Sequence, residues 1–171
     1  MADERAITGC LTGLAVGDAL GLPYENLSPR RAGRLFTDVD RYHFLFGRGM
    51  FSDDTEHACM TAQALLASGG DGSRFARSLS WRLRWWLFGC PPAIGLATLK
   101  ACLKLWLGFS PNRSGVRSAG NGPCMRGPIL GVALGDRPEM LGEFLARSTR
   151  MTHTDPRAEQ FEFGLTYIIG R

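Results

Sequence analysis

The sequence lacks the patterns that define several common classes of protein. Its five cysteines form no Cys-x-x-Cys pair and no cluster with histidine at zinc-binding spacing, so a structural zinc site is not expected. Several of them stand among apolar neighbours, as free thiols do, which indicates a reducing, cytoplasmic location. The N-terminal residues are acidic and lack the apolar core of a secretion signal. No internal repeat or low-complexity tract occurs.

Long apolar runs and blocks of like charge are also missing. Residues 93–107 are interrupted by two lysines, and no other run reaches the length of a membrane span, so no membrane contact is expected. The net charge of +4 is spread along the chain, which fits an anionic ligand or weak nucleic-acid contact and requires neither. Aromatic and arginine residues alternate over 81–86 and could stack on bases or lie at a membrane surface. Because Leu79, Leu83 and Trp86 share one helical face, packing is favoured there and nucleic acid is disfavoured.

The length of 171 residues and the hydrophobic fraction of 44% are those of one globular domain, 1–171. No segment alternates like a strand, whereas helical spacing and start signals recur, so the predicted fold class is all-α. Asp136-Arg137-Pro138-Glu139 and Asp155-Pro156 are typical of helix starts. The predicted helices cover residues 4–20, 53–67, 73–88, 91–107, 121–134, 137–150 and 155–170, and residues 22–50 are predicted as mostly loop, with a short helical turn open to residues 29–35.

The first predicted helix carries a glycine at every fourth position. Gly9, Gly13, Gly17 and Gly21 would line one face, and such a stripe predicts that another backbone packs closely against it. A phosphate-binding loop would need a preceding strand and a different glycine spacing. Asp18 lies near the end of this helix, and either a structural hydrogen-bonding role or a site role is open to it.

Two adjacent carboxylates mark the start of the third predicted helix, in Phe51-Ser52-Asp53-Asp54-Thr55-Glu56-His57-Ala58. Ser52 or Asp53 is a natural N-cap, because a helix N-terminus has unpaired N–H groups and a partial positive charge. The four residues 52–55 also offer consecutive oxygen ligands of the kind that Mg²⁺ or Mn²⁺ prefers. Both interpretations, cap and metal ligand, follow from these residues.

A second irregular segment, residues 108–122, is rich in glycine and serine and contains Arg113 and Arg117. Small residues leave backbone N–H groups accessible, and a predicted helix follows at once. This combination indicates an anion or phosphate site, with a flexible linker as the alternative.

Four separated motifs resemble those of the ADP-ribosylglycohydrolase family, which includes the dinitrogenase-reductase-activating glycohydrolases. The resemblance extends from about residue 6 to the end of the chain. In order, the motifs are Gly13-Leu14-Ala15-Val16-Gly17-Asp18-Ala19-Leu20-Gly21 with Pro23 and Glu25, then Ser52-Asp53-Asp54-Thr55, then Gly120-Asn121-Gly122-Pro123-Cys124-Met125-Arg126, and finally Thr152-His153-Thr154-Asp155-Pro156-Arg157-Ala158.

The resemblance implies an orthogonal all-α bundle with a binuclear Mg²⁺ or Mn²⁺ centre at the base of a cleft. It implies hydrolysis of ADP-ribosyl groups from protein side chains or related ADP-ribose conjugates. By motif, Ser52, Asp53 and Asp54 would be metal ligands, and Glu25 and Asp54 would be catalytic. The residues that would bind the substrate are Gly120, Asn121, Gly122, Met125, Arg126 and His153.

The chain departs from the family pattern in one respect. The family's second metal-ligand cluster, an Asp-x-Asp-Thr motif, has no counterpart in this sequence. The chain therefore resembles the N-terminal part of the family's fold, and a bundle cut at this point would expose apolar helix faces such as Leu165, Ile168 and Ile169.

Three hypotheses follow for the function. The first is a metal-dependent glycohydrolase that acts on an ADP-ribosylated protein or an ADP-ribose-containing small molecule, with the missing ligands supplied from outside this chain. The second is a fragment or relative that binds ADP-ribose or a single metal without turnover, and the third is a helical interaction module. Exposed apolar faces also predict self-association.

Overall fold

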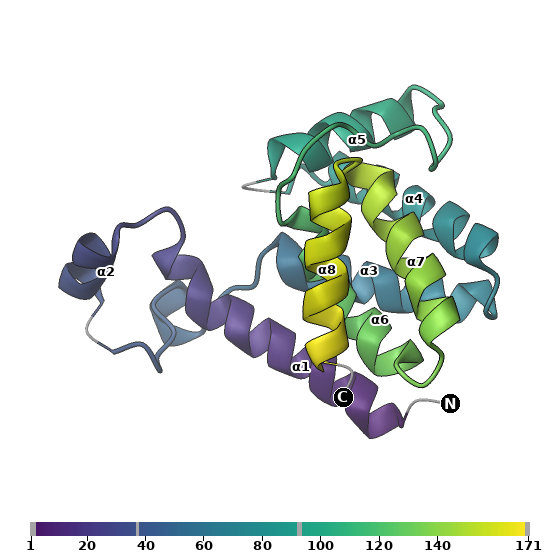
Figure 1. Ribbon diagram of the computed structural model, residues 1–171. Helices are drawn as coiled ribbons and strands as arrows, with labels where there is room; N and C mark the ends of the chain where they lie inside the picture. Colours follow the sequence, from purple (N-terminus) through teal and green to yellow (C-terminus); the bar gives the residue numbers. More distant parts are fainter. Residues whose placement is uncertain (1–2, 37, 92–93, 170–171) are drawn as a thin grey trace.

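Helices make up the regular secondary structure of the computed structural model, which describes residues 3–36, 38–91 and 94–169, with 45 and 167–169 by backbone alone (Figure 1). Within these ranges the one β-type pairing is an isolated parallel bridge between Val116 and His153, so the all-α prediction is confirmed. The α-helices are α1 (Glu4–Gly21), α2 (Pro29–Leu35), α3 (Asp53–Ser68), α4 (Gly72–Phe88), α5 (Leu96–Trp106), α6 (Gly127–Leu134), α7 (Pro138–Thr152) and α8 (Pro156–Ile169). Short 3₁₀ helices are η1 (Leu22–Tyr24), η2 (Leu45–Gly47) and η3 (Gly122–Met125).

Side-chain caps set the starts of several helices. Asp3 accepts a hydrogen bond from the backbone N–H of Arg5 at the start of α1, and Asp71 accepts one from Arg74 at the start of α4. Helix α3 ends at Gly69, which adopts a left-handed conformation with φ 58° that a glycine reaches without strain. These local signals explain why five of the seven predicted helices, and the short turn open to residues 29–35, match the observed helices closely.

Two predicted helices have different bounds in the structure. The range 91–107 was too long, because α5 begins after Gly95, whose ψ of 136° is not helical. The range 121–134 is divided into η3 and α6 at Arg126. Proline lacks an N–H group, so a helix running continuously through Pro128 would lose a backbone hydrogen bond there.

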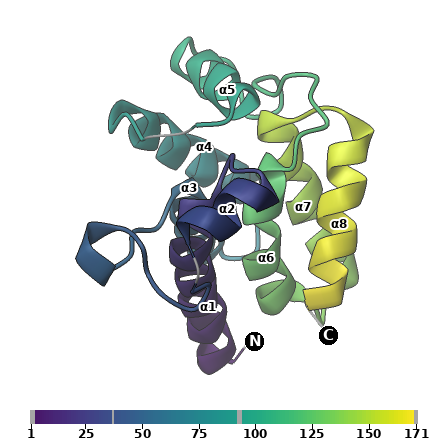
Figure 2. The same ribbon diagram turned by 90° about the vertical axis from the view of Figure 1, so that its left-hand side faces the viewer.

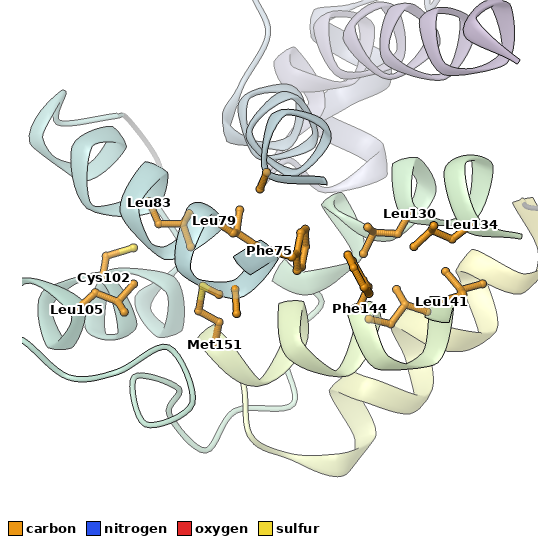
Figure 3. Close-up of a cluster of buried hydrophobic side chains, with 13 residues drawn as sticks. Phe75, Leu79, Leu83, Cys102, Leu105, Leu130, Leu134, Leu141, Phe144 and Met151 are labelled. Atoms are coloured by element: carbon orange, nitrogen blue, oxygen red, sulfur yellow. The ribbon is translucent and has the colours of Figure 1, made fainter. Parts of the chain in front are cut away.

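The main hydrophobic core lies between α3, α4, α5, α6 and α7 (Figure 3). Phe75 of α4 and Phe144 of α7 meet at its centre, with their ring centroids 4.8 Å apart. Leucines from α4, α6 and α7 extend the core on both sides of the two rings, and Leu105, Cys102 and Met151 fill the end near α5. This core holds α3 and the segment before α6 in fixed positions.

Helix α1 packs on α3 and α6 but lies largely outside the core, and Ala19 is its one buried residue. Its C-terminal end, η1 and α2 extend away from the other helices (Figure 1), and α2 lies in front of them when that side faces the viewer (Figure 2). Residues Glu4–Tyr24 are long and apolar enough to cross a membrane by length and composition, so the expectation that no run reaches this length was wrong. Core helices and signal sequences pass the same test, and this observation alone is weak evidence for a membrane span.

The glycine stripe of α1 faces open space. A Cβ atom built on Gly9, Gly13, Gly17 or Gly21 meets no atom within 4 Å. Among the residues described, no backbone packs against this stripe, so the predicted close helix contact is wrong for this chain. The stripe instead lines a hollow between α1 and α6 with a volume of about 660 Å³.

Candidate functional site: an acidic cleft

The start of α3 presents two carboxylates beside a cap. The Ser52 hydroxyl accepts a hydrogen bond from the backbone N–H of Asp54 at 3.3 Å. Asp53 and Asp54 then occupy the first turn, where the partial positive charge of the helix favours negative groups. The Ser52 hydroxyl is therefore used within the backbone turn, and Ser52 does not line the cleft described below.

Asp18 joins α1 to this turn. One of its carboxylate oxygens, Oδ2, accepts hydrogen bonds from the backbone N–H of Ser52 (2.8 Å), the backbone N–H of Thr55 (3.2 Å) and the Thr55 hydroxyl (2.6 Å). Thr55 itself is buried. The structure thus assigns to Asp18 the structural role that the sequence left open, as a second cap supplied by a different helix.

The carboxylates of this region repel one another. Burial, and then the neighbouring Asp54, raise the pKa of Asp53 to about 6. Burial, followed by Asp18 and Glu25, also raises the pKa of Asp54. None of the ion pairs found in the described parts of the chain involves these four residues. The site is therefore an uncompensated negative cluster that favours a cationic ligand or a developing positive charge.

Glu25 and both aspartates of α3 line a cleft of about 380 Å³. Glu25 follows η1 and is exposed. Across the cleft are the start of α5, the segment before η3, and the residue that follows α7. The lining residues on that side are Gly95, Leu96, Ala97, Thr98, Ser118, Gly120, Asn121, Gly122, Met125 and His153.

The glycine-containing segment is held against His153. The backbone N–H of Val116 donates to Thr152, and that of Thr154 donates to Val116, at 3.1 and 2.9 Å. A Cβ atom at position 122 would lie 3.0 Å from the His153 ring, so a larger residue there would fit only if the ring moved by a few tenths of an ångström. Burial, and then Arg126, lower the pKa of His153 to about 4, which leaves the imidazole neutral near pH 7.

Arg126 does not line the cleft, although the sequence placed it there. Its side chain is fully buried and donates to the Ser148 hydroxyl (2.9 Å), the Ser148 carbonyl (3.1 Å) and the Thr152 hydroxyl (2.8 Å). Its Nη1 atom also lies 3.2 Å from Nδ1 of His57 on α3. Arg126 therefore connects α3 and α7 beneath the cleft.

The structure brings most of the predicted site residues together. Glu25, Asp53 and Asp54 face Gly120, Asn121, Gly122, Met125 and His153 across one cleft, although the motifs are far apart in the sequence. Sequence reasoning missed Thr98, and it did not single out Ser118 within the segment 108–122 that it predicted as an anion site. For Thr98 the available signal was Gly95, after which α5 begins, because a helix start leaves backbone N–H groups without helical partners.

The hollow beneath the glycine stripe meets the same acidic cluster. It is bounded at one end by Asp18, Glu25 and Asp54, and two of these residues, Glu25 and Asp54, also line the cleft. The cluster therefore lies where the two hollows join.

The described residues do not by themselves fit a metal ion. Their oxygen donors are of the right chemical kind, but no three His, Cys, Asp or Glu side chains in the described part of the chain are gathered closely enough to hold an ion. Asp53 and Asp54 could supply at most part of a coordination shell.

Fold and site define an all-α domain in which an acidic helix start faces a glycine-containing segment across a cleft. The chain belongs to the ADP-ribosylglycohydrolase family, whose model matches residues 1–169. The family is generally metal-dependent.

Two relatives with curated sequences are similar to this chain. An uncharacterized protein of Archaeoglobus fulgidus is 32% identical over 160 residues, which is 91% of this chain and 52% of that protein. The uncharacterized protein YegU of Escherichia coli (strain K12) is 37% identical over 97 residues, which is 50% of this chain and 29% of that protein. The chain thus spans about half the length, or less, of these relatives.

Proposed function

We propose that this chain forms part of a hydrolase that releases ADP-ribosyl groups from modified protein side chains or related ADP-ribose conjugates. Family membership supports the reaction class. The observation that carries the proposal for this chain is the cleft in which Glu25, Asp53 and Asp54 face the Gly120–Gly122 segment.

Each wall of the cleft suits one part of such a substrate. The glycine-containing wall carries small residues, so its backbone N–H groups, apart from that of Gly120, which donates to the Ser118 hydroxyl, would be open to the oxygen atoms of a diphosphate. The neutral ring of His153 adds a polar group that can donate or accept a hydrogen bond. The acidic wall would then lie beside the ribose.

The acidic wall suits a glycosidic carbon that becomes positively charged. When the bond between ribose C1″ and the leaving atom breaks, its electron pair departs with that atom, and the nearby carboxylates stabilise the cationic carbon. Glu25 would take a proton from the water whose oxygen bonds to C1″, and the same proton would then pass to the departing atom, so that Glu25 returns to its starting state. Alternatively, Glu25 would hold the ribose hydroxyls.

We propose that Mg²⁺ or Mn²⁺ would bind here only with ligands additional to Asp53 and Asp54. Burial, and then the neighbouring Asp54, raise the pKa of Asp53, and a bound cation would offset the repulsion between these two carboxylates. Titration calorimetry with Mn²⁺ should give weak binding, with a Kd of about 0.1 mM or higher, because few protein ligands are available. Tight, sub-micromolar binding would contradict an incomplete shell.

The substrate proposal is tested by ADP-ribose binding to the intact chain. The double variant Asp53→Asn/Asp54→Asn should change the affinity for ADP-ribose at least about fivefold, because it removes two of the three acidic lining groups. The matched control is Asp3→Asn/Asp71→Asn, which alters two exposed helix caps outside the cleft. Equal affinities for the two double variants would contradict the site assignment.

A second candidate is a fragment that binds without turnover. The observation that favours it is that the described residues bring no third carboxylate, histidine or cysteine close enough to Asp53 and Asp54 to complete a metal site. Release of ADP-ribose from an arginine- or serine-modified protein, with saturating Mg²⁺ or Mn²⁺, would establish the hydrolase. Retained ADP-ribose binding without any release would support the binding fragment.

A further inference from the structure

One exposed face of α4 carries arginine at one end and aromatic residues at the other. Arg74, Arg77, Trp81, Trp85 and Phe88 are all exposed and are spaced by three, four, four and three residues, so they form one stripe. The exposed fractions of Trp81, Trp85 and Phe88 are 56%, 53% and 70%. Large aromatic side chains seldom line the solvent side of a helix without a partner.

Helix α5 extends this surface. Trp106 lies with its ring centroid 6.2 Å from those of Trp85 and Phe88, and its indole N–H donates to the Arg84 carbonyl. Leu103 and Leu107 are 49% and 77% exposed. We define the aromatic face as the apolar residues Trp81, Trp85, Phe88, Leu103, Trp106 and Leu107.

The surroundings of the aromatic face are basic. No aspartate or glutamate occurs between Gly72 and Gly135, whereas nine arginines and lysines do. The carboxylates of neighbouring elements point elsewhere: Glu56 accepts from the Trp86 indole, and Glu143 pairs with Arg147 near the start of α4. Asp71 caps the N-terminal end of α4, where it lies beside Arg74 and Arg77 and offsets part of their charge. The partner of this face is therefore anionic.

Charge and shape exclude several possible partners of the aromatic face. A second copy of the same face would bring like charges together. Trp81, Trp85 and Trp106 contact one another edge to face at 73° and 70°, which occupies ring surfaces that nucleobases would need for stacking. The hollow among Trp81, Arg84, Trp85 and Trp106 measures about 250 Å³, too small to seat a peptide helix.

We propose that the aromatic face binds the surface of an anionic lipid bilayer. Tryptophan is enriched at the boundary between headgroups and acyl chains, where phenylalanine and leucine side chains can enter the apolar region. The exposed side chains of Arg74, Arg77 and Lys100 would remain among the anionic headgroups. In both views α5 lies at the opposite end of the molecule from the N-terminus of α1 (Figures 1 and 2). This proposal does not depend on the proposed hydrolase activity, and it replaces the expectation of no membrane contact.

Vesicle co-sedimentation of the intact chain tests the proposal. Binding is expected to vesicles of phosphatidylcholine with about one-third phosphatidylglycerol, and to be at least about tenfold weaker on phosphatidylcholine alone or in molar salt. A blue shift of tryptophan fluorescence should accompany binding.

Two variants should each reduce vesicle binding at least about tenfold: Trp85→Ser/Leu107→Ser, and the charge reversal Arg74→Glu/Arg77→Glu. The second alters only exposed side chains, so it tests the face even where the first variant does not fold.

Matched controls separate this face from other exposed apolar residues. Leu66→Ser on α3 and Val16→Ser on α1 change side chains that are 81% and 42% exposed, and both variants should bind as the parent does. Loss of binding in Val16→Ser with full binding in Arg74→Glu/Arg77→Glu would overturn the proposal in favour of α1. Binding to oligothymidine without binding to anionic vesicles would overturn it in favour of nucleic acid.

Discussion

Glu162 is a carboxylic acid enclosed by protein on all sides. It accepts a hydrogen bond from the Thr149 hydroxyl, whereas its other oxygen has no partner among the described residues. Arg126 attracts the ionised form, but burial dominates and raises the pKa of Glu162 to about 7. The folded protein therefore retains a proton that the unfolded chain releases near the ordinary pKa of 4.5.

The sign of the pH dependence follows from this raised pKa. Between about pH 4.5 and pH 7 the folded state binds more protons than the unfolded state, so the free energy of unfolding falls as pH rises. Glu162→Gln mimics the protonated acid and removes this loss. Urea denaturation should find the variant similar to the parent at about pH 5 and roughly 2 kcal/mol more stable at about pH 8.

Glu159→Gln provides the comparison for this measurement. Glu159 lies one helical turn earlier on α8 and pairs with Arg150, whose side chain is 63% exposed. This variant should show no gain in stability at high pH, because an exposed ion pair contributes little. A similar gain in both variants would mean that burial of Glu162 is not the cause.

At the scale of single residues, the motifs predicted which residues line the cleft better than they predicted which side chains are buried. Asp53, Asp54, Gly122 and His153 stand in short motifs, and the structure places all four along the cleft. The burial of Arg126 was not predictable from its motif, because its partners His57, Ser148 and Thr152 come from other helices. Long-range partners decide whether an arginine faces a ligand or the protein interior.

At the scale of elements, the start of α3 depends on α1. Asp18→Ala would leave the N–H groups of Ser52 and Thr55 and the Thr55 hydroxyl without their shared acceptor. We expect the variant to lose about 2–3 kcal/mol of unfolding free energy, and Asp18→Asn to lose less than half of that, because the amide retains an acceptor oxygen.

Chemical denaturation of both variants, beside Asp3→Ala, checks this prediction. Asp3 caps its own helix through one exposed hydrogen bond, so its loss should cost about 0.5–1 kcal/mol. If Asp3→Ala and Asp18→Ala lose equal unfolding free energy, the hydrogen bonds from Asp18 to α3 stabilise the fold no more than a cap within one helix does.

Helix prediction succeeded where capping is local and failed where it is not. Ser52 and Asp71 mark the starts of α3 and α4 within a few residues of sequence. The break at Arg126 depends on Pro128 together with the buried position of the arginine side chain, and only the proline is visible in the sequence. The glycine stripe of α1 was interpreted as a contact surface, but this chain contains no described element that covers it.

At the scale of the whole molecule, the hollow beside α1 is left uncovered by the described elements. It measures about 660 Å³, is lined by glycines and apolar residues of α1 together with Pro128 and Val132 of α6, and opens onto the acidic cluster. Relatives extend to about twice the length of the matched region, since the match covers 52% of the Archaeoglobus protein. An apolar hollow of this size favours occupation by another segment.

Association of the chain with itself through this hollow is the prediction at this scale. Light scattering at concentrations of tens of micromolar should show species larger than the monomer, because water-exposed apolar surface is removed by contact. Gly13→Glu places a charged side chain in the hollow, where the position has free space, and should return the chain to the monomer. Gly33→Glu is the matched control, since this glycine of α2 also has no neighbour within 4 Å but lies outside the hollow. If both variants associate as the parent does, the contact lies on a surface other than this hollow.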